Sequence, residues 1–160
     1  MSQDQRLFRN LLGRFATGVC VVAAVGEHRK PIGMTINSFS SASLSPSLVQ
    51  WSLRKECIAY RLFSDLREFS ISVLSENQLE ISRQYAKPGD HFLGEADYET
   101  SANGVPFIRG SIAHFECRPW QKYEAGDHDI FVSSVDRFVS GEQNEPLVFF
   151  EGNYRSLLLI

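Results

Sequence analysis

The run Val19-Cys20-Val21-Val22-Ala23-Ala24-Val25 is continuous, apolar and rich in β-branched residues. Such a run is typical of a strand that is buried on both faces. The polar residues 26–31 predict a hairpin turn, and residues 32–36 predict the strand that returns beside the first one. The β structure of the chain therefore begins with a buried hairpin.

An uncharged polar stretch starts near the end of this hairpin. It reads Gly33-Met34-Thr35-Ile36-Asn37-Ser38-Phe39-Ser40-Ser41-Ala42-Ser43-Leu44-Ser45-Pro46. Ser, Thr and Asn form hydrogen bonds without formal charge, which suits a flat ligand with polar edges. The end of a strand is also a usual place for functional residues. A serine-rich turn without a ligand is the alternative interpretation.

Short apolar or alternating runs continue through the rest of the chain, separated by turn residues. They predict strands at residues 48–53, 69–74, 106–108, 111–118, 127–139 and 146–151. Three helices are expected: one that Asp4 caps and that ends at residues 17–18, one at residues 57–64, and one at residues 79–86 behind a capping box at residues 75–78. This pattern predicts a mainly β fold, a closed or partly closed antiparallel barrel with a few short helices.

Three segments carry more specific expectations. Residues 8–15 place an apolar stripe on one side of the first helix. In residues 111–118 the side chains alternate, and those expected to face water are His114, Glu116 and Arg118. Residues 91–104 lose periodicity, which predicts a mobile or partner-contacting excursion.

Length and composition predict one soluble globular domain over residues 1–160. Hydrophobic residues make up 43% and charged residues 22% of the chain, which is ordinary for a folded protein. The net charge of −3 and the scattered basic residues argue against nucleic acid or a membrane as the main partner. Three widely spaced cysteines fit reduced thiols, and residues 1–6 lack the order of a secretion signal, so a cytoplasmic protein is expected.

Sequence motifs for several common chemistries are absent. The four histidines have no partner at metal-ligand spacing, so no metal site is expected, and no GxSxG, Walker or GxGxxG pattern occurs. Three features each allow two interpretations. A serine and two cations, Ser52, Arg54 and Lys55, come just before a predicted helix start. This arrangement is typical of an anion-binding site, and the alternative is a solvated turn with two surface cations. Cys57 is an activated thiol or a buried apolar residue, and His128, between two carboxylates, is a functional or a surface histidine.

A set of motifs follows one another in a specific order. They are Gly13-Arg14-Phe15-Ala16-Thr17-Gly18-Val19, Gly33-Met34-Thr35-Ile36-Asn37-Ser38-Phe39-Ser40-Ser41, Ser45-Pro46, Leu48, residues 69–74, Gly126-Asp127-His128 and residues 146–154. Together they cover nearly the whole chain and resemble the flavin reductase-like family, the small reductase components of two-component flavin-dependent monooxygenases. The resemblance implies a homodimeric, FMN-binding split β-barrel, antiparallel and Greek-key-like. It also implies that NADH or NADPH reduces FMN or FAD, and that reduced flavin passes to a partner monooxygenase.

The resemblance also implies the site residues. The polar loop holds the flavin ring in this family, which implies ring contacts from Met34, Thr35, Ile36, Asn37 and Ser38. The segment that holds the ribityl chain and phosphate would correspond to Ser52, Leu53, Arg54, Lys55 and Cys57, with further flavin contacts from Arg83 and Phe92. The Gly-Asp-His motif implies that His128 contacts the nicotinamide nucleotide, with Tyr154 nearby. Cys57 stands where Ser or Thr is usual.

Two other functions stay open at this point. The first is a flavin-binding electron carrier or storage protein that has the same barrel but does not turn over NADH or NADPH. The second is a barrel that binds another ligand or only a protein partner. The Gly-Asp-His setting of His128 favours the reductase over the carrier.

Overall fold

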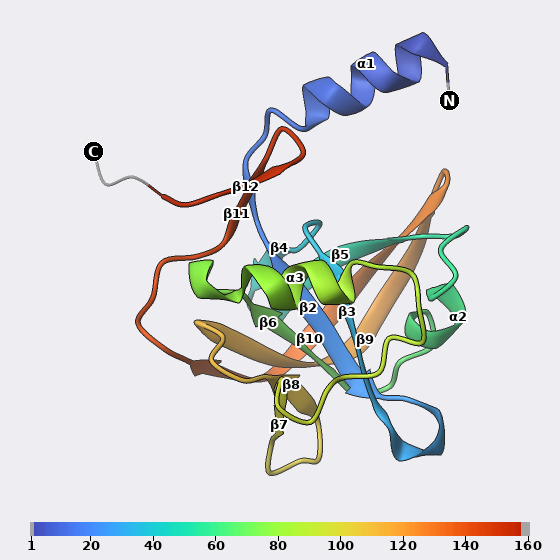
Figure 1. Ribbon diagram of the computed structural model, residues 1–160. Coiled ribbons are helices and arrows are strands. Elements are labelled where there is room, and N and C mark those ends of the chain that lie inside the picture. Colours follow the sequence, from blue (N-terminus) through green and yellow to red (C-terminus); the bar gives the residue numbers. More distant parts are fainter. Residues whose placement is uncertain (1, 158–160) are drawn as a thin grey trace.

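The computed structural model describes residues 2–157 and consists mainly of β-strands. The main strands are β2 (Cys20–Val25), β3 (Pro31–Ile36), β4 (Ser40–Leu44), β5 (Ser47–Arg54), β6 (Phe69–Val73), β9 (Ala113–Ala125) and β10 (His128–Ser140). They form one seven-stranded sheet in the order β3-β2-β6-β9-β10-β5-β4, with antiparallel neighbours. The sheet curls round a core, but its edge strands β3 and β4 do not pair with each other (Figure 1). The expected mainly β, antiparallel split barrel is confirmed.

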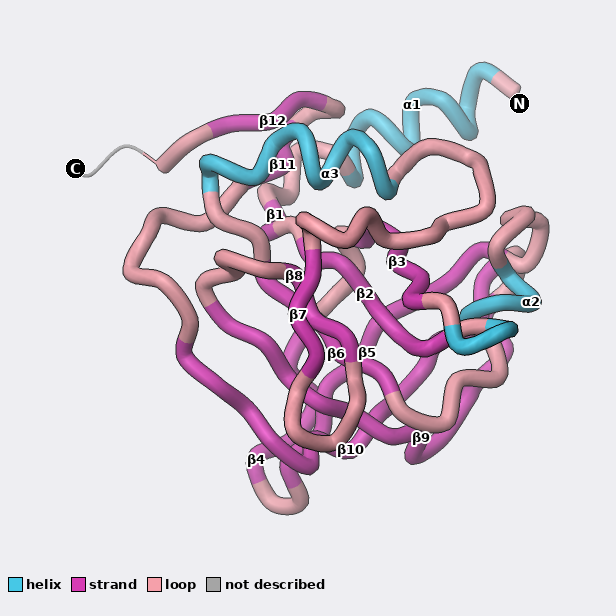
Figure 2. Tube along the Cα trace, turned by 60° about the horizontal axis from the view of Figure 1, so that its bottom comes forward, coloured by secondary structure: helices cyan, strands magenta, loops and turns pink. Residues whose placement is uncertain are grey.

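Smaller elements surround this sheet. β1 (Thr17–Gly18), β11 (Val148–Phe150) and β12 (Asn153–Arg155) form a three-stranded sheet, and β7 (Tyr98–Thr100) pairs with β8 (Pro106–Ile108). The helices are α1 (Gln3–Leu12), α2 (Tyr60–Phe63) and α3 (Leu79–Tyr85), with short 3-10 turns η1 (Glu27–Arg29) and η2 (Glu76–Gln78). Figure 2 shows α3 lying across one side of the barrel and α2 near another. Within residues 2–157 no helix is long and apolar enough to cross a membrane.

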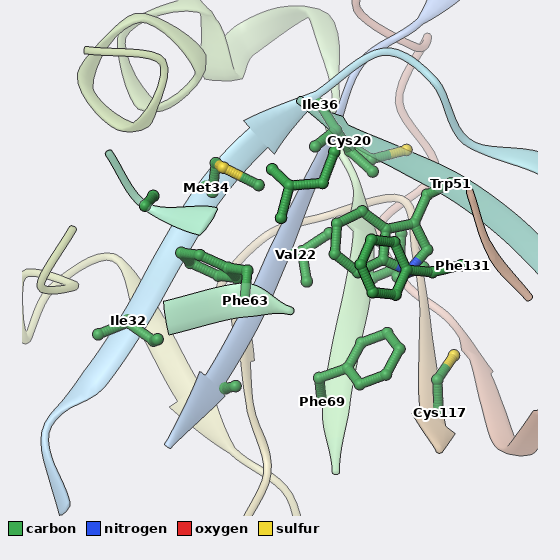
Figure 3. Packing of buried hydrophobic residues seen from close by; sticks show 14 of the residues in the cluster. Cys20, Val22, Ile32, Met34, Ile36, Trp51, Phe63, Phe69, Cys117 and Phe131 are labelled. Carbon is green, nitrogen blue, oxygen red and sulfur yellow. The ribbon is translucent and has the colours of Figure 1, made fainter. Parts of the chain in front are cut away.

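Aromatic rings fill the barrel (Figure 3). Trp51 stacks on Phe131 with ring centroids 4.7 Å apart, and Phe69 meets Trp51 edge-on at 6.0 Å. Strand β2 packs Val22 into this interior and Val21 into a second core layer beneath α3. Each fully buried side chain of this size stabilises the fold by about 1.5–3 kcal/mol. Strand β2 is therefore buried on both faces, as its continuous apolar sequence predicts.

The first helix does not pack on this core. Its N-cap is Ser2 and not the expected Asp4, because Ser2 and Gln5 form a reciprocal capping box. The helix ends at Leu12, earlier than residues 17–18. None of its residues is buried, and the Phe8 side chain is 65% exposed. Figure 1 shows α1 beside the β11–β12 hairpin, away from the barrel, and the apolar residues of its stripe remain at least half exposed.

The outer face of β6 and β9 is polar but covered. The expectation that His114 and Glu116 face water is wrong, since they are only 7% and 3% exposed. The Phe107 ring stacks on His114 at 4.0 Å, and Asn103 Nδ2 donates to Glu116 at 3.0 Å. Burial lowers the pKa of His114. The covering hairpin β7–β8 includes the end of the segment 91–104, which is therefore packed against the barrel along this part.

Two expected boundaries are also wrong. The helix expected at residues 57–64 is the single turn α2, because Cys57 lies in a hydrogen-bonded turn after β5. No helix N-terminus therefore assists anion binding at this point. The strand expected at residues 111–118 continues to Ala125, because it pairs with β10 along most of its length. The chain reverses at Gly126, which has a φ of 65°.

Gly141 offers a test of the packing at the end of β10. A Cβ added there would lie 1.8 Å from the carbonyl oxygen of Ser111, so backbone would have to move. We expect Gly141→Ala to lower the free energy of unfolding by roughly 1–3 kcal/mol. Gly89→Ala is the control, because its added Cβ meets nothing within 4 Å. Urea unfolding measures both variants, and equal stabilities would contradict the close approach.

Candidate functional site

One hydroxyl joins the polar loop to the end of β5. Ser38 Oγ accepts from the Ser52 N–H at 3.0 Å and donates to the Ser52 carbonyl oxygen at 3.1 Å. Two residues further along β5, Arg54 is the direct cross-strand partner of His128 on β10, and such partners have neighbouring side chains. The polar loop, the end of β5 and the start of β10 thus form one continuous polar strip.

A second set of contacts ties the end of β3 to α3 and the C-terminal hairpin. Thr35 Oγ1 donates to the Ser82 carbonyl oxygen at 2.8 Å, and the hydroxyls of Ser82 and Tyr154 are 2.8 Å apart. The Arg83 guanidinium lies 5.9 Å from the centroid of the Tyr154 ring, a cation–π contact. Ser82, which sequence reasoning missed, is fully buried and connects Thr35 with Tyr154.

The polar strip borders two hollows. A small cavity of about 180 Å³ is lined by Val19, Thr35, Ile36, Asn37, Ala86, Phe149 and Tyr154. A cleft of about 920 Å³ beside α1 shares Asn37 and Phe149 with it. Neutral hydrogen-bonding groups next to apolar walls are typical of sites for small organic ligands. This donor set fits the polar edge and apolar faces of a flavin ring.

Strand alternation divides the predicted ring-binding residues into two groups. The side chains of Met34, Ile36 and Leu53 are 6%, 8% and 4% exposed and belong to the barrel core. They can offer a ligand only their backbone groups. Thr35 and Ser52 point to the opposite faces of their strands, as the period of two requires. The side chains available to a ligand are therefore the polar ones.

Two further predicted contacts, Phe92 and Cys57, also have neighbours within the fold. Phe92 bridges Ile32, and four residues along β3 separate Ile32 from Ile36, a distance of about 13 Å. Lys30 Nζ lies 4.7 Å from the centroid of the Phe92 ring. Cys57 is half-buried and packs against the barrel core. Phe92 therefore lies beside the start of the polar stretch and away from Asn37 and Ser38 at the end of β3, and Cys57 packs on the barrel core.

The two cations of the strip have different surroundings. Arg54 NH2 lies 2.7 Å from Glu56 Oε2, and both of these side chains are mostly exposed. Lys55 Nζ lies 3.4 Å from Asp129 Oδ1 and 3.5 Å from Glu124 Oε1, and the Asp129 side chain is only 4% exposed. Removing the partner of a buried charge is costly, so Lys55 is committed to the fold. Arg54 is the cation that is freer to bind an anionic ligand.

The buried carboxylate of Asp129 was also missed from the sequence. The Tyr60 hydroxyl donates to its Oδ2. This hydrogen bond, together with the charge of Lys55, holds the pKa of Asp129 below its usual value. The same hydrogen bond, with burial, raises the pKa of Tyr60 to about 12. Asp129 is two residues before Phe131 on β10, so the two side chains lie on the same face of the strand. This spacing is the signal that could have placed Asp129 inside the barrel.

His128 is oriented by its neighbour. Its Nδ1 lies 2.8 Å from Asp127 Oδ1, and the hydrogen bond lowers the pKa of Asp127. A carboxylate accepts hydrogen bonds, so Nδ1 carries the proton and Nε2 is left for another partner. The His128 side chain is 42% exposed. It can therefore contact a ligand that lies over Arg54.

Other reactive groups lie away from this strip. Burial raises the pKa of the Cys20 and Cys117 thiols to about 12, so both remain protonated near neutral pH. Among residues 2–157 no cluster of three or more His, Cys, Asp or Glu side chains is arranged to hold a metal ion.

Asp129→Asn tests the carboxylate contacts. Because the pKa of Asp129 is lower in the folded chain, its charged form stabilises the fold above the unfolded-state pKa of about 3.9, and this contribution is lost as the pH falls through the folded-state value. We expect the variant to be less stable than wild type near neutral pH, and the difference to shrink below about pH 4. Urea unfolding of the variant and wild type, from acid to neutral pH, measures this difference in stability.

Asp136→Asn is the matched control for this variant. It removes an exposed ion pair with Arg118, so its stability is expected to differ little from that of wild type at any pH. A stability difference for Asp129→Asn that is equal in acid and at neutral pH would contradict the assigned contacts.

Comparison with known proteins identifies the family. Residues 12–158 match the flavin reductase like domain. FMN reductase (NADH) SmoA of Agrobacterium fabrum is 43% identical over 152 residues, which cover 95% of this chain and 86% of that protein. The reductase component of flavin-dependent trigonelline monooxygenase of Acinetobacter baylyi is 37% identical over 135 residues, 84% of this chain but 44% of that longer protein. A structure of the NADH:FAD oxidoreductase of Streptomyces globisporus, in complex with NAD and FAD fragments, superimposes with a TM-score of 0.89 at 34% identity, covering 98% of this chain and 94% of that one. The chain belongs to the flavin reductase-like family.

Proposed function

We propose that this chain is a flavin reductase, an oxidoreductase that transfers hydride from NADH or NADPH to FMN or FAD. The observation that carries the proposal is the polar strip, in which Ser38 joins the neutral loop to β5 beside Arg54 and His128. Relatives named as an NADH-dependent FMN reductase and as a monooxygenase reductase component support it. The reduced flavin then goes to a partner flavin-dependent monooxygenase. Residues 1–160 act as a single flavin reductase-like domain.

Different residues of the strip bind different parts of the flavin. Thr35, Asn37 and Ser38 provide neutral hydrogen bonds to the ring, supplemented by the backbone of Met34 and Ile36. The segment from Ser52 to Leu53 runs beside the ribityl chain. Arg54 holds the phosphate through charge-assisted hydrogen bonds. Because the ring is held without formal charge, its binding stays weak enough for exchange.

The chain supplies orientation to the reaction. When both cofactors are bound, the nicotinamide supplies a hydride and the flavin accepts it. Hydride transfer requires no general base from the protein, so the hydrogen-bonded pair of Asp127 and His128 serves to orient the ligand and not to move a proton. Asp127 holds the His128 ring so that Nε2 can contact the nicotinamide nucleotide. Ser82 holds the Tyr154 hydroxyl at the other end of the strip. Fixing two reactants in contact can lower a barrier by about 7–11 kcal/mol at the upper end.

Replacement of His128 tests its assignment to the nicotinamide nucleotide. We expect His128→Ala to raise the KM for NADH roughly tenfold, as for the loss of one strong hydrogen bond. The Kd for FMN should change much less. Steady-state kinetics and flavin titration measure the two effects. Unchanged NADH kinetics would remove His128 from the site, and His28→Ala is the control for replacing an exposed histidine elsewhere.

The proposed assembly is a homodimer. Its support is α1, a helix with an apolar stripe and no buried residue that borders the cleft of about 920 Å³ next to Asn37. A helix of this kind gains stability only when its apolar face is covered, and a second copy presents the same apolar helix and cleft. A two-fold pair can therefore bury both stripes at once.

A charge on the stripe of α1 tests the dimer. We expect wild type to be dimeric and Phe8→Asp to be monomeric when light scattering is measured during gel filtration, because the aspartate would be buried without a partner. Val25→Asp, at an exposed apolar position at the end of β2, should stay dimeric. A dimeric Phe8→Asp variant would exclude the stripe as the interface.

NADH oxidation with added flavin separates the proposed function from its rivals. The purified protein is mixed with NADH and either FMN, FAD or riboflavin, and loss of the reduced nicotinamide is followed. Fast turnover that depends on flavin supports a reductase, and the best of the three substrates is the preferred flavin. Flavin binding without turnover would instead favour an electron carrier. A cytoplasmic location is proposed as well, since the three cysteines are free thiols.

A further inference from the structure

The phosphate end of the polar strip is crowded with carboxylates. Arg54 pairs with Glu56, and Lys55 pairs with Glu124 and with Asp129. Asp127 lies close enough for the charge of Arg54 to lower its pKa further. Carboxylates therefore outnumber cations where an anionic ligand is expected. An incoming phosphate meets cations that already have partners.

Glu56 is the carboxylate that a ligand must displace. It lies two residues after Arg54 in the turn that follows β5, and its Oε2 is 2.7 Å from Arg54 NH2. The two side chains are 57% and 75% exposed. Exposed pairs of this kind are weak, so a ligand can displace Glu56 without disturbing the fold. Asp129, in contrast, is buried and holds Lys55 in place.

We propose that Glu56 sets the affinity for flavin by competing with the flavin phosphate for Arg54. The inference rests on the proposed function and deepens it. The phosphate of FMN is a monoester, which carries more charge than one carboxylate and forms bidentate hydrogen bonds with a guanidinium, so it displaces Glu56 when FMN binds. When flavin leaves, Glu56 returns to Arg54. The pair thereby favours exchange of flavin as a substrate over its retention as a resident cofactor.

The competition acts only on flavins that carry a phosphate. Riboflavin has the same ring and ribityl chain without the phosphate, so its binding does not require Arg54 to leave Glu56. The effect also depends on salt, because both partners are exposed and mobile ions screen them. These two properties distinguish competition from a general change in the shape of the site.

The test compares FMN and riboflavin binding by Glu56→Gln and wild type at low salt, measured by quenching of flavin fluorescence. We expect the Kd for FMN to fall roughly 1.5- to 5-fold in the variant, and the dissociation rate of FMN to fall with it. The Kd for riboflavin should stay unchanged. Glu99→Gln is the matched control, since it removes an exposed ion pair with Arg109 far from the strip, and it should leave both flavins unaffected.

Arg54→Ala separates failure of this inference from failure of the proposed function. Two results together support the competition. Arg54→Ala should weaken the binding of FMN but not of riboflavin, and Glu56→Gln should tighten the binding of FMN. Weaker FMN binding in Arg54→Ala with no change in Glu56→Gln overturns the inference and leaves the flavin site standing. Equal tightening of both flavins in Glu56→Gln also overturns it. Absence of flavin binding and of flavin-dependent NADH oxidation in wild type would overturn both.

Discussion

The hydrogen bonds of the Ser38 hydroxyl with the backbone of Ser52 are the constraint on which the site depends. They close the gap between the end of β3 and the end of β5, two strands that lie far apart in the order of the main sheet. A loop of Ser, Thr and Asn alone has no fixed relation to Arg54 or His128. Fixed to β5, it becomes one end of a polar strip whose other end is the β9–β10 turn.

The chemistry of this strip follows from where charge is placed. The loop at residues 37–38 contains only neutral donors and acceptors, and the part at Arg54 and Lys55 contains cations that carboxylates already partly neutralise. The neutral loop and the partly neutralised cations both limit how tightly a flavin can be held. A reductase that passes reduced flavin to another protein needs this limit, because a tightly bound flavin would not leave. The buried Asp129 keeps Lys55 in the fold and leaves Arg54 for the ligand.

Local patterns predicted a large part of the fold. The continuous apolar run in β2 indicated burial on both faces, and the capping box of Ser75 and Gln78 before α3 is present. What failed depends on contacts between distant segments. His114 and Glu116 are buried because the β7–β8 hairpin covers them, and nothing in their own strand shows that cover.

The site shows the same division. Motif order proposed the loop, the end of β5 and His128 as site residues, and the fold brings these segments together. The links through Ser82 and Asp129 arise only when α3, α2 and β10 are packed together. Phe92 was expected to contact the flavin and lies beside Ile32 on β3, because its position depends on the path of the segment after α3. The identity of a side chain makes it a candidate site residue, but the packing of distant segments determines which candidate residues come into contact.

Hydrogen–deuterium exchange with and without saturating FMN tests the central claim that the Ser38–Ser52 contact builds a single flavin site. We expect slower amide exchange on FMN binding in residues 33–38 and 52–57 together, with residues 98–108 unchanged. FMN binding that leaves residues 33–38 unprotected, or that protects only the cleft near residues 119–122 between β9 and α2, would contradict it.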